Sequence, residues 1–432
     1  MTTTLKHLLR LLLRYRLVSS PQQRGFTLIE LLVALIISTL VVSGLLTFVN
    51  SVSQTERREL VKANAQQEIQ DATDFIVRDL QEAVYIYDAV GLSSTGLAGI
   101  ADNIPPLGGA GNLGGATRCD SIATCRPVLA FWKRRGLDRC DSLPGAGGNR
   151  TRVGIVTGQA FAAASRPSTA ALDSATECQR GDNAFVYSLV VYYLIRDPDN
   201  NPSATWSRAA RIGRFEIRDG VVNPTQTDPA NRFNAPAIPP DPGYLPFNLG
   251  NITADTRIAS IDEAMRAWKS DTSLPPSFSA GYTPNAAYAA TSMQILADFI
   301  DDTPTTTTNP TIQNGINVLS RLMPIPIAVG IPTGNTVNPD DACADPNRGA
   351  MGPGATRVPR DLTTAGQLNL SSFYACVSAN RAAARVYLRG NALARLRPRV
   401  LPNRRPVTAA NVGFLPTAEA RVYGRGFFVP IR

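Results

Sequence analysis

A single carboxylate interrupts the most apolar stretch of the chain. Residues 26 to 49 read FTLIELLVALIISTLVVSGLLTFV, and Glu30 is the charged side chain among them. A helix of this length spans about 36 Å at about 1.5 Å per residue, which is enough to cross a lipid bilayer. An ionised carboxylate at membrane depth costs on the order of several kcal/mol unless a cation offsets it. The sequence therefore predicts a cationic partner for Glu30.

Histidine is nearly absent from the chain, and this limits the chemistry that the chain can perform. The one histidine, His7, precedes the apolar stretch. Ser-His-Asp and Cys-His catalysis and histidine metal sites are therefore not expected after it. We expect no enzyme activity, no metal and no cofactor. An enzyme that acts on glycans with a pair of carboxylates remains an alternative, because the chain has 34 acidic residues.

All cysteines follow the apolar stretch. An even number on one side of a membrane favours an oxidising compartment and disulfides. Zinc is disfavoured because no CxxC occurs, whereas free buried thiols remain an alternative. Proximity in the sequence favours pairing of Cys343 with Cys376, and pairing of the other four among themselves. The disulfide candidates are Cys119, Cys125, Cys140, Cys178, Cys343 and Cys376.

The residues before the apolar stretch are basic. Lys6, Arg10, Arg14, Arg16 and Arg24 occur before Gly25 without an acidic residue among them. Positive residues on one side of a span predict that this side is cytoplasmic. The chain after about residue 50 is then expected outside the cytoplasm, in the periplasm, as the globular part of a single-pass inner-membrane protein. An uncleaved signal anchor would explain this topology equally well, but it would not explain Glu30.

The segment RGFTLIELLVALIIS, which begins at Arg24, resembles the processing site of type IV prepilins and pseudopilins. The resemblance implies that a prepilin peptidase cuts between Gly25 and Phe26 and methylates the new terminal amine of Phe26. It also implies that this ammonium meets Glu30 of a neighbouring subunit in a filament. The expected partners are the prepilin peptidase, other pilins or pseudopilins, the inner-membrane pilus assembly platform with its ATPase, and the membrane itself.

The predicted elements suit such a subunit. Residues 51 to 87 contain no proline or glycine, and their apolar positions recur at spacings of three and four, which predicts an amphipathic helix that continues the span. The expected organisation is a cytoplasmic leader at 1–25, a transmembrane helix at 26–49, an amphipathic helix at 50–88 and a globular pilin-like domain at 89–432.

The globular part is expected to be α+β, with an antiparallel sheet laid on the long N-terminal helix and decorated by long loop insertions. Short helices are predicted near 260 to 269 and 288 to 300. Stretches rich in Ala, Gly, Ser and Pro predict loops at 91 to 117, 143 to 176 and 223 to 247. The predicted strands are 127 to 133, 185 to 195, 211 to 217, 384 to 390 and 419 to 429.

Two polar motifs have both a functional and a structural interpretation. Between Asp361 and Glu419 the chain is rich in arginine and contains no acidic residue. This run could bind an acidic polysaccharide, DNA or lipid head groups, or its members could pair with distant carboxylates. In RDPDNNP, Asp197, Asp199 and Asn201 have the spacing of a calcium loop, but a hairpin turn is favoured. The candidate polyanion-binding residues are Arg381, Arg385, Arg389, Arg395, Arg397 and Arg399.

Several segments after the N-terminal motif are similar to the cyanobacterial hormogonium polysaccharide secretion pseudopilins. They include KANAQQEIQDATDFIVRDLQEAVYIYD, PVLAFWKR and the YACV and ARVYLRGNALAR block. This resemblance implies a minor subunit of a pilus-like machine for polysaccharide secretion and gliding motility, exposed on a filament or at the cell surface after assembly. A type II secretion pseudopilin and a DNA-uptake minor pilin remain alternatives.

Overall fold

The computed structural model describes the chain in segments. These are residues 26–92, 99–101, 104–105, 119, 121–144, 150–162, 181–221, 238–241, 244, 265–266, 268, 293–303, 312–313, 316–317, 343, 351–360, 368, 370, 372–396 and 411–425. The predicted leader, residues 1–25, lies outside them. By its internal contacts the chain forms two compact units, Met1–Leu60 and Val61–Arg432. The fold is α+β, as expected.

Helix α2 (Leu28–Gln81) is the longest element and passes from the first unit into the second. Its part in the second unit buries a stripe at helical spacing, which consists of Ala65, Ile69, Ala72, Ile76 and Leu80. Positions three and four apart share one face of a helix, so this stripe presents one continuous apolar surface. The predicted amphipathic helix is thereby confirmed in this region.

The helix ends before the position expected from the sequence. It stops at Gln81, and residues that were predicted to continue it to 88 form strand β1 (Ala83–Ile86). Valine, tyrosine and isoleucine in this segment suit a strand, and β1 pairs antiparallel with β2 (Cys125–Leu137). The prediction was wrong here because the spacing of the apolar residues fits both a helix and a strand. The distant strand β2 provides the backbone hydrogen-bond partners that favour the strand.

Within the described residues, five antiparallel strands form one sheet in the order β1-β2-β5-β6-β7. The added strands are β5 (Ala184–Ile195), β6 (Ala210–Arg218) and β7 (Met293–Ile300). Ten consecutive residues at the end of β5 are buried, so both faces of this central strand are covered. Pro127 of β2 lies beside a break in register with β5, where a missing N–H does least harm.

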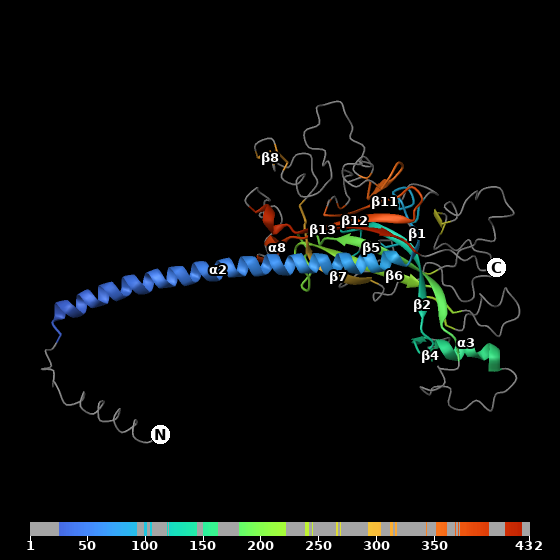
Figure 1. Cartoon of the computed structure of the whole chain (residues 1–432), viewed down its shortest axis with the longest axis horizontal. Helices are drawn as coiled ribbons and strands as arrows, with labels where there is room; N and C mark the ends of the chain where they lie inside the picture. Colours follow the sequence, from blue (N-terminus) through green and yellow to red (C-terminus); the bar gives the residue numbers. More distant parts are fainter. Residues whose placement is uncertain are drawn as a thin grey trace, which may run out of the picture. The chain divides into compact units, whose positions relative to one another are not determined.

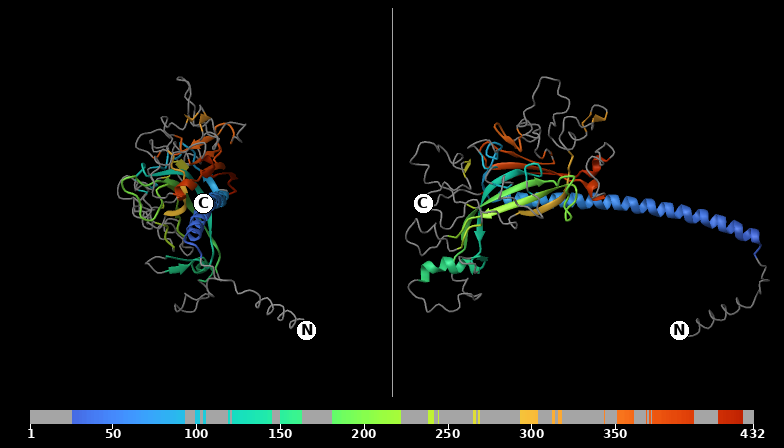
Figure 2. Two further views of the ribbon diagram at one scale, coloured as in Figure 1. Left: turned by 90° about the vertical axis from the view of Figure 1, so that its left-hand side faces the viewer. Right: turned by 180° about the vertical axis from the view of Figure 1, so that it is seen from behind.

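A second sheet has the order β10-β11-β12-β13 in the described part of the chain. Figures 1 and 2 show it as a separate layer, drawn in orange and red, next to the teal and green strands β2, β5 and β6. An isolated bridge between Ile300 and Gly390 links the two sheets. The strands of this sheet are β10 (Thr356–Val358), β11 (Phe373–Val377), β12 (Ala383–Arg389) and β13 (Thr417–Tyr423).

The smaller elements complete the second unit. β3 (Ser142–Pro144) pairs with β4 (Arg150–Arg152), and β8 (Ile312–Gln313) pairs with β9 (Ile316–Asn317). The helical elements are α3 (Val153–Ala162), α8 (Ala392–Leu396) and the 3-10 turn Val412–Phe414. The five predicted strands all fall within or overlap β2, β5, β6, β12 and β13, although β13 ends at Tyr423 rather than at 429.

Two predictions of local structure were wrong. The helix expected at 288 to 300 is strand β7 over its described residues, because Met293 and the residues after it pair with β6. The loop expected at 143 to 176 contains β4 and α3, whose Val153 is fully buried. Of the helix expected near 260 to 269, Met265 and Arg266 are helical, and most of the remainder lies outside the described residues.

One hydrophobic core joins helix and sheets. Ile69, Ala72, Ile76 and Leu80 of α2 belong to one cluster of buried residues. The same cluster includes Trp132 and Phe215 of the first sheet and Phe373 and Leu388 of the second. Burial of this stripe fixes which side chains of α2 face inward in the second unit. Among the polar side chains of this part of the helix, Thr73 and Asp79 are buried as well.

Candidate functional site

The first unit presents an apolar helix surface with no internal cover. The side chains from Leu28 to Val49 are exposed, and Leu28 is 88% exposed. The hydroxyls of Ser38, Thr39 and Thr47 donate to backbone carbonyls three or four residues earlier in the helix. Each hydroxyl is therefore satisfied without water. By its length and composition, α2 qualifies as a membrane-spanning helix.

Glu30 lies in the first turn of α2, where it closes a capping box with Thr27. The Thr27 hydroxyl donates to Glu30 Oε2 at 3.1 Å and the Thr27 N–H approaches the same oxygen at 3.3 Å. In return, the Glu30 N–H reaches the Thr27 hydroxyl at 3.4 Å. A Thr-x-x-Glu sequence favours this reciprocal arrangement at a helix start, and the helix dipole favours a negative charge there.

The capping box turns the Glu30 carboxylate back toward the start of the helix. Both contacts of the carboxylate use Oε2, which leaves Oε1 available to a cation from outside the chain. Phe26, four residues earlier, is 80% exposed. Gly25, the other residue of the predicted cleavage site, lies outside the described residues. The geometry therefore supplies an oriented anion at the beginning of an apolar, exposed helix.

Asp79 is a second carboxylate on α2, and it is buried in the second unit. It accepts hydrogen bonds from Lys133 Nζ at 2.8 Å, Arg214 Nε at 2.7 Å and the Tyr192 hydroxyl at 2.6 Å. These partners come from the neighbouring strands β2, β6 and β5. Glu216 provides a further carboxylate at 2.7 Å from Arg214 Nη1. This cluster attaches the end of α2 to the middle of the first sheet.

The pKa values in this cluster follow from burial and charge. Burial alone would raise the pKa of Asp79, but the hydrogen bonds and positive charges of Arg214 and Lys133 outweigh it, so the pKa of Asp79 lies below its ordinary value. Burial alone would lower the pKa of Arg214, but the contacts with Asp79 and Glu216 raise it. Burial raises the pKa of Tyr192 well above its ordinary value. Asp79 and Arg214 are therefore ionised as a salt bridge at neutral pH, and Tyr192 is a neutral donor.

The candidate polyanion-binding arginines that the structure describes are each paired with a distant carboxylate. Arg381 pairs with Asp88 at 3.0 Å and Arg385 pairs with Glu419 at 2.7 Å. The remaining pairs are Arg389 with Asp301, both fully buried at 2.7 Å, and Arg395 with Glu68. Arg397 and Arg399 lie outside the described residues. These pairs are the distant carboxylate partners that the sequence had left as one of two interpretations of the arginine run.

The cysteines of the described residues are oxidised. Cys119 is bonded to Cys125, and Cys343 is bonded to Cys376, as sequence proximity had favoured. Cys140 is disulfide-bonded as well. Cys178 lies outside the described residues. The disulfides fit the expected oxidising compartment.

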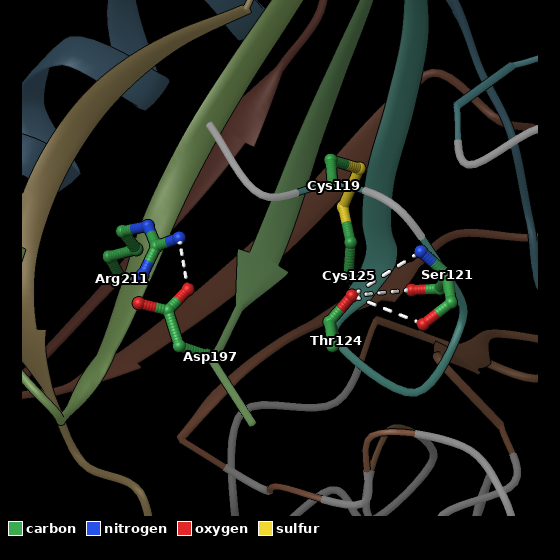
Figure 3. Close-up of a disulfide and its surroundings, with 6 residues drawn as sticks. All are labelled: Cys119, Ser121, Thr124, Cys125, Asp197 and Arg211. Carbon is green, nitrogen blue, oxygen red and sulfur yellow. Dashed lines mark hydrogen bonds and ion pairs between the residues drawn. A yellow bond between two sulfur atoms is a disulfide. The ribbon is translucent and has the colours of Figure 1, made fainter. Parts of the chain in front are cut away.

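Figure 3 shows the Cys119–Cys125 disulfide near the start of β2. The Thr124 hydroxyl donates to the Ser121 carbonyl at 3.1 Å inside the small loop that the disulfide closes. The backbone N–H of Arg196 donates to the Thr124 carbonyl at 2.8 Å, which connects this loop with the end of β5. The contacts are those of a local structural brace.

The RDPDNNP motif lies in the connection between β5 and β6, as a hairpin-turn segment. Asp197 binds Arg211 Nη2 at 2.7 Å (Figure 3). It also accepts the Ser203 N–H at 2.8 Å. Asp199 pairs with Arg196. Among the described residues, no group of three or more His, Cys, Asp or Glu side chains is arranged to hold a metal ion.

Sequence reasoning missed two residues of this organisation. Thr27 is the capping partner of Glu30, and the Thr-x-x-Glu spacing at the start of an apolar run was the available signal. Asp79 gave no comparable signal, because Lys133 and Arg214 are 54 and 135 residues away in the chain. Its role emerges only when the strands are in place.

Comparisons with known proteins identify the N-terminal segment. The family described as "Prokaryotic N-terminal methylation motif" matches residues 20–46. This match supports a type IV prepilin-like N-terminus, and with it processing by a prepilin peptidase and association with other pilins and the membrane. Together with the apolar helix, it fits a membrane-anchored protein. No curated protein and no solved structure matches the chain.

Proposed function

We propose that this protein is a minor pilin or pseudopilin of a type IV pilus-like machine that serves polysaccharide secretion and gliding motility. The observation that carries the proposal is the Glu30 carboxylate, held at the start of an exposed apolar helix within the matched methylation motif. An anion in this position is costly in a membrane unless assembly brings a cation to it.

Processing creates that cation. Hydrolysis of the peptide bond between Gly25 and Phe26 consumes one water, leaves a carboxylate on Gly25 and gives Phe26 a terminal ammonium group. Transfer of a methyl group from a methyl donor to this amine replaces one of its protons, which leaves, and so keeps the positive charge. When subunits stack, the ammonium of one Phe26 can reach Oε1 of Glu30 in a neighbour, and each charge then offsets the desolvation cost of the other.

The proposed position in the filament rests on the size of the second unit, and the proposed role in secretion rests on the sequence. Bulky insertions would crowd a dense helical shaft, so we place this subunit at a filament tip or initiating position. The globular unit then faces the periplasm, and the ATPase of the machine drives extension or retraction. We also propose that the chain is a mechanical component and not an enzyme. The role in polysaccharide secretion comes from the resemblance to hormogonium secretion pseudopilins.

Mass spectrometry of the mature N-terminus tests the central step. The expected result is a chain that begins at methylated Phe26. A Gly25→Leu variant should accumulate as the uncut precursor, because a large side chain at this position blocks access of the peptidase, whereas Gly25→Ala serves as the small-residue control. An intact Met1 in the wild type, or a start at another residue, would refute the proposal.

The competing roles predict different partners. Cross-linking of intact cells should recover components of a pilus-like polysaccharide exporter if the proposal is correct, and a type II secretion platform if that alternative is correct. A DNA-uptake role predicts that DNA is retarded in a gel by the detergent-solubilised protein, with steep loss of binding as salt increases. The carboxylate partners of Arg381, Arg385, Arg389 and Arg395 argue against that result.

A further inference from the structure

A groove runs along α2 in the second unit. It has a volume of about 490 Å³, which lies in the range of small-molecule sites. We call it the α2 groove. It is lined by Asn64, Gln67, Glu68, Asp71, Ala72, Phe75 and Arg78 of α2, with Leu296 of β7 and Arg395 of α8.

The groove is elongated along the helix. Its lining positions on α2 recur at spacings of three and four from Asn64 to Arg78 and therefore form one stripe. At about 1.5 Å per residue this stripe is roughly 21 Å long. Figure 1 shows β7 and α8 against the same part of the helix. Such a shape suits an extended chain better than a single compact molecule.

Contacts within the second unit fix one wall of the groove before any ligand arrives. Glu68 accepts the Asp298 N–H at 2.9 Å and pairs with Arg395. Arg395 in turn lies over the ring of Phe299, at 4.5 Å from its centroid. Phe299 has a φ of 55°, a left-handed conformation that is strained for a bulky residue and is often found at binding sites. The orientation of both charged groups is therefore set in advance.

The floor of the groove offers an aromatic surface. Phe75 is 36% exposed, whereas its neighbours Ala72 and Ile76, which face the core, are buried. The guanidinium groups of Arg214 and Arg78 lie 5.6 and 6.0 Å from its ring centroid. These contacts hold the ring in place while part of it remains open. An exposed aromatic beside polar side chains is suited to a ligand with both apolar and hydroxyl faces.

The charges of the α2 groove balance. Glu68 and Asp71 contribute two negative charges, and Arg78 and Arg395 contribute two positive charges. A polyanion such as DNA or a uronic acid polymer requires an excess of positive charge, which this lining lacks. A helix of another subunit requires a broad apolar strip, whereas Ala72, Phe75 and Leu296 are the apolar members here.

Amides, carboxylates and guanidinium groups together donate and accept hydrogen bonds along the whole stripe. Sugar rings present paired hydroxyls at their edges and C–H groups on their faces, which match these side chains and Phe75. We propose that the α2 groove binds a neutral oligosaccharide chain. This site goes beyond the proposed assembly function, because it belongs to the second unit and does not depend on cleavage at Phe26.

Isothermal titration calorimetry of the full chain in detergent tests the proposal, with cellohexaose and maltohexaose as neutral probes and hexagalacturonate as the anionic comparator. The detergent should carry a polyoxyethylene head, since a maltoside would compete for the groove. We expect a neutral hexasaccharide to bind with a dissociation constant of about 1 mM or below, and more tightly than hexagalacturonate. Phe75→Ala should weaken binding about fivefold or more.

Matched variants separate binding from folding. Gln67→Ala removes a groove amide, and Gln70→Ala removes an exposed amide of the same helix outside the groove. Phe185→Ala is the control for Phe75→Ala, because Phe185 is 59% exposed on β5. Loss of affinity in Gln67→Ala and Phe75→Ala, with wild-type affinity in both controls, would support the site.

Three results of the titrations would overturn the proposal. They are no heat with either neutral probe at roughly 10 mM, equal loss of affinity in the control variants, and tighter binding of hexagalacturonate. A photo-crosslinker at Asp71 that captures a second copy of the chain would also overturn it, by assigning the groove to subunit packing. N-terminal processing should stay normal in every groove variant, so failure here is distinguishable from failure of the proposed function.

Discussion

Two of the carboxylates on helix α2, Glu30 and Asp79, have completely different surroundings. Asp79 is buried and has Lys133, Arg214 and Tyr192 of its own chain as donors. The Glu30 carboxylate has the hydroxyl and the backbone N–H of Thr27 as donors to Oε2, and its Oε1 accepts neither of them. Folding gives Asp79 all of these donors from its own chain. It orients Glu30 but leaves Oε1 of that carboxylate available to a partner.

The apolar side chains of the helix show the same difference. Ile76 is 0% exposed in the second unit, whereas Ile36 is 49% exposed in the first. The first unit therefore has a surface made for lipid or for other helices, and the second has a core of its own. One continuous helix thus has an exposed apolar surface in the first unit and a buried apolar face in the second.

Asp79→Ala should have the largest effect on the stability of the second unit. The substitution leaves Lys133 and Arg214 buried without this counterion, and we expect a loss of about 3–5 kcal/mol in the free energy of unfolding. All three tryptophans, Trp132, Trp206 and Trp268, lie in the second unit, so urea unfolding of the full chain in detergent can be followed by their fluorescence.

Asp74→Ala is the control for this prediction. Asp74 lies on the same helix but is exposed, and exposed substitutions usually change the free energy of unfolding by less than about 0.5 kcal/mol. An equal loss in both variants would show that the buried cluster does not attach the helix to the sheet.

Ile76→Ala should have the next largest effect. Removal of a buried isoleucine side chain costs about 2–5 kcal/mol through lost apolar contacts and the cavity left behind. The same substitution at Ile36 should leave the tryptophan-reported unfolding unchanged, because Ile36 belongs to the other unit. If Ile36→Ala lowered the urea midpoint as much, the distinction between the two parts of the helix would be wrong.

Much of this organisation could be predicted from the sequence, because its signals are local. The charge in the apolar run, the glycine before Phe26 and the absence of proline and glycine from 51 to 87 identify the N-terminal helix. Continuous runs of β-branched and aromatic residues predicted the central strands, and proximity favoured the Cys343–Cys376 disulfide. Each of these signals depends on neighbours within one element or on a short separation.

The remaining features depend on contacts between distant segments. The helix ends at Gln81 because the next residues pair with β2, and residues 293 to 300 form a strand because β6 offers an edge. The arginine partners Asp88, Asp301 and Glu68 lie far from the arginine run in sequence. No periodicity or spacing encodes such pairs, so neither the buried cluster nor the α2 groove was foreseeable.

Glu30→Gln should affect assembly and not folding. Glutamine retains the capping box with Thr27 but carries no charge, so the helix start is preserved while the ion pair with a neighbouring ammonium is lost. A charge-assisted contact contributes about 1.5–3 kcal/mol, so we expect roughly ten- to hundredfold less protein in sheared filaments. Immunoblots of filament and membrane fractions would measure this.

Comparison with Glu30→Ala separates the charge from the cap. Alanine removes both, and it should reduce filament incorporation at least as much as glutamine does. Processing at Phe26 should continue in both variants, and the tryptophan-reported unfolding should match the wild type. Normal incorporation of Glu30→Gln would mean that the carboxylate serves the helix cap alone.

Acid should reduce the difference in stability between wild type and Asp79→Asn, measured as the midpoint of urea unfolding. This is the smallest effect expected. The pKa of Asp79 is lower in the folded chain than in the unfolded chain, because the attraction of Arg214 and Lys133 outweighs the cost of burial. A carboxylate with a depressed pKa contributes stability that is complete above its unfolded pKa of about 3.9 and is lost as the pH falls through the lower, folded value.

Urea unfolding of both proteins between neutral pH and pH 3 should therefore show two midpoints that converge below about pH 4. As the pH falls toward the folded pKa of Asp79, the proton that enters the buried cluster removes the charge which Asn lacks from the start. If the difference between the two midpoints stays constant across this range, Asp79 stabilises the fold by its shape and hydrogen bonds alone, and its charge contributes nothing.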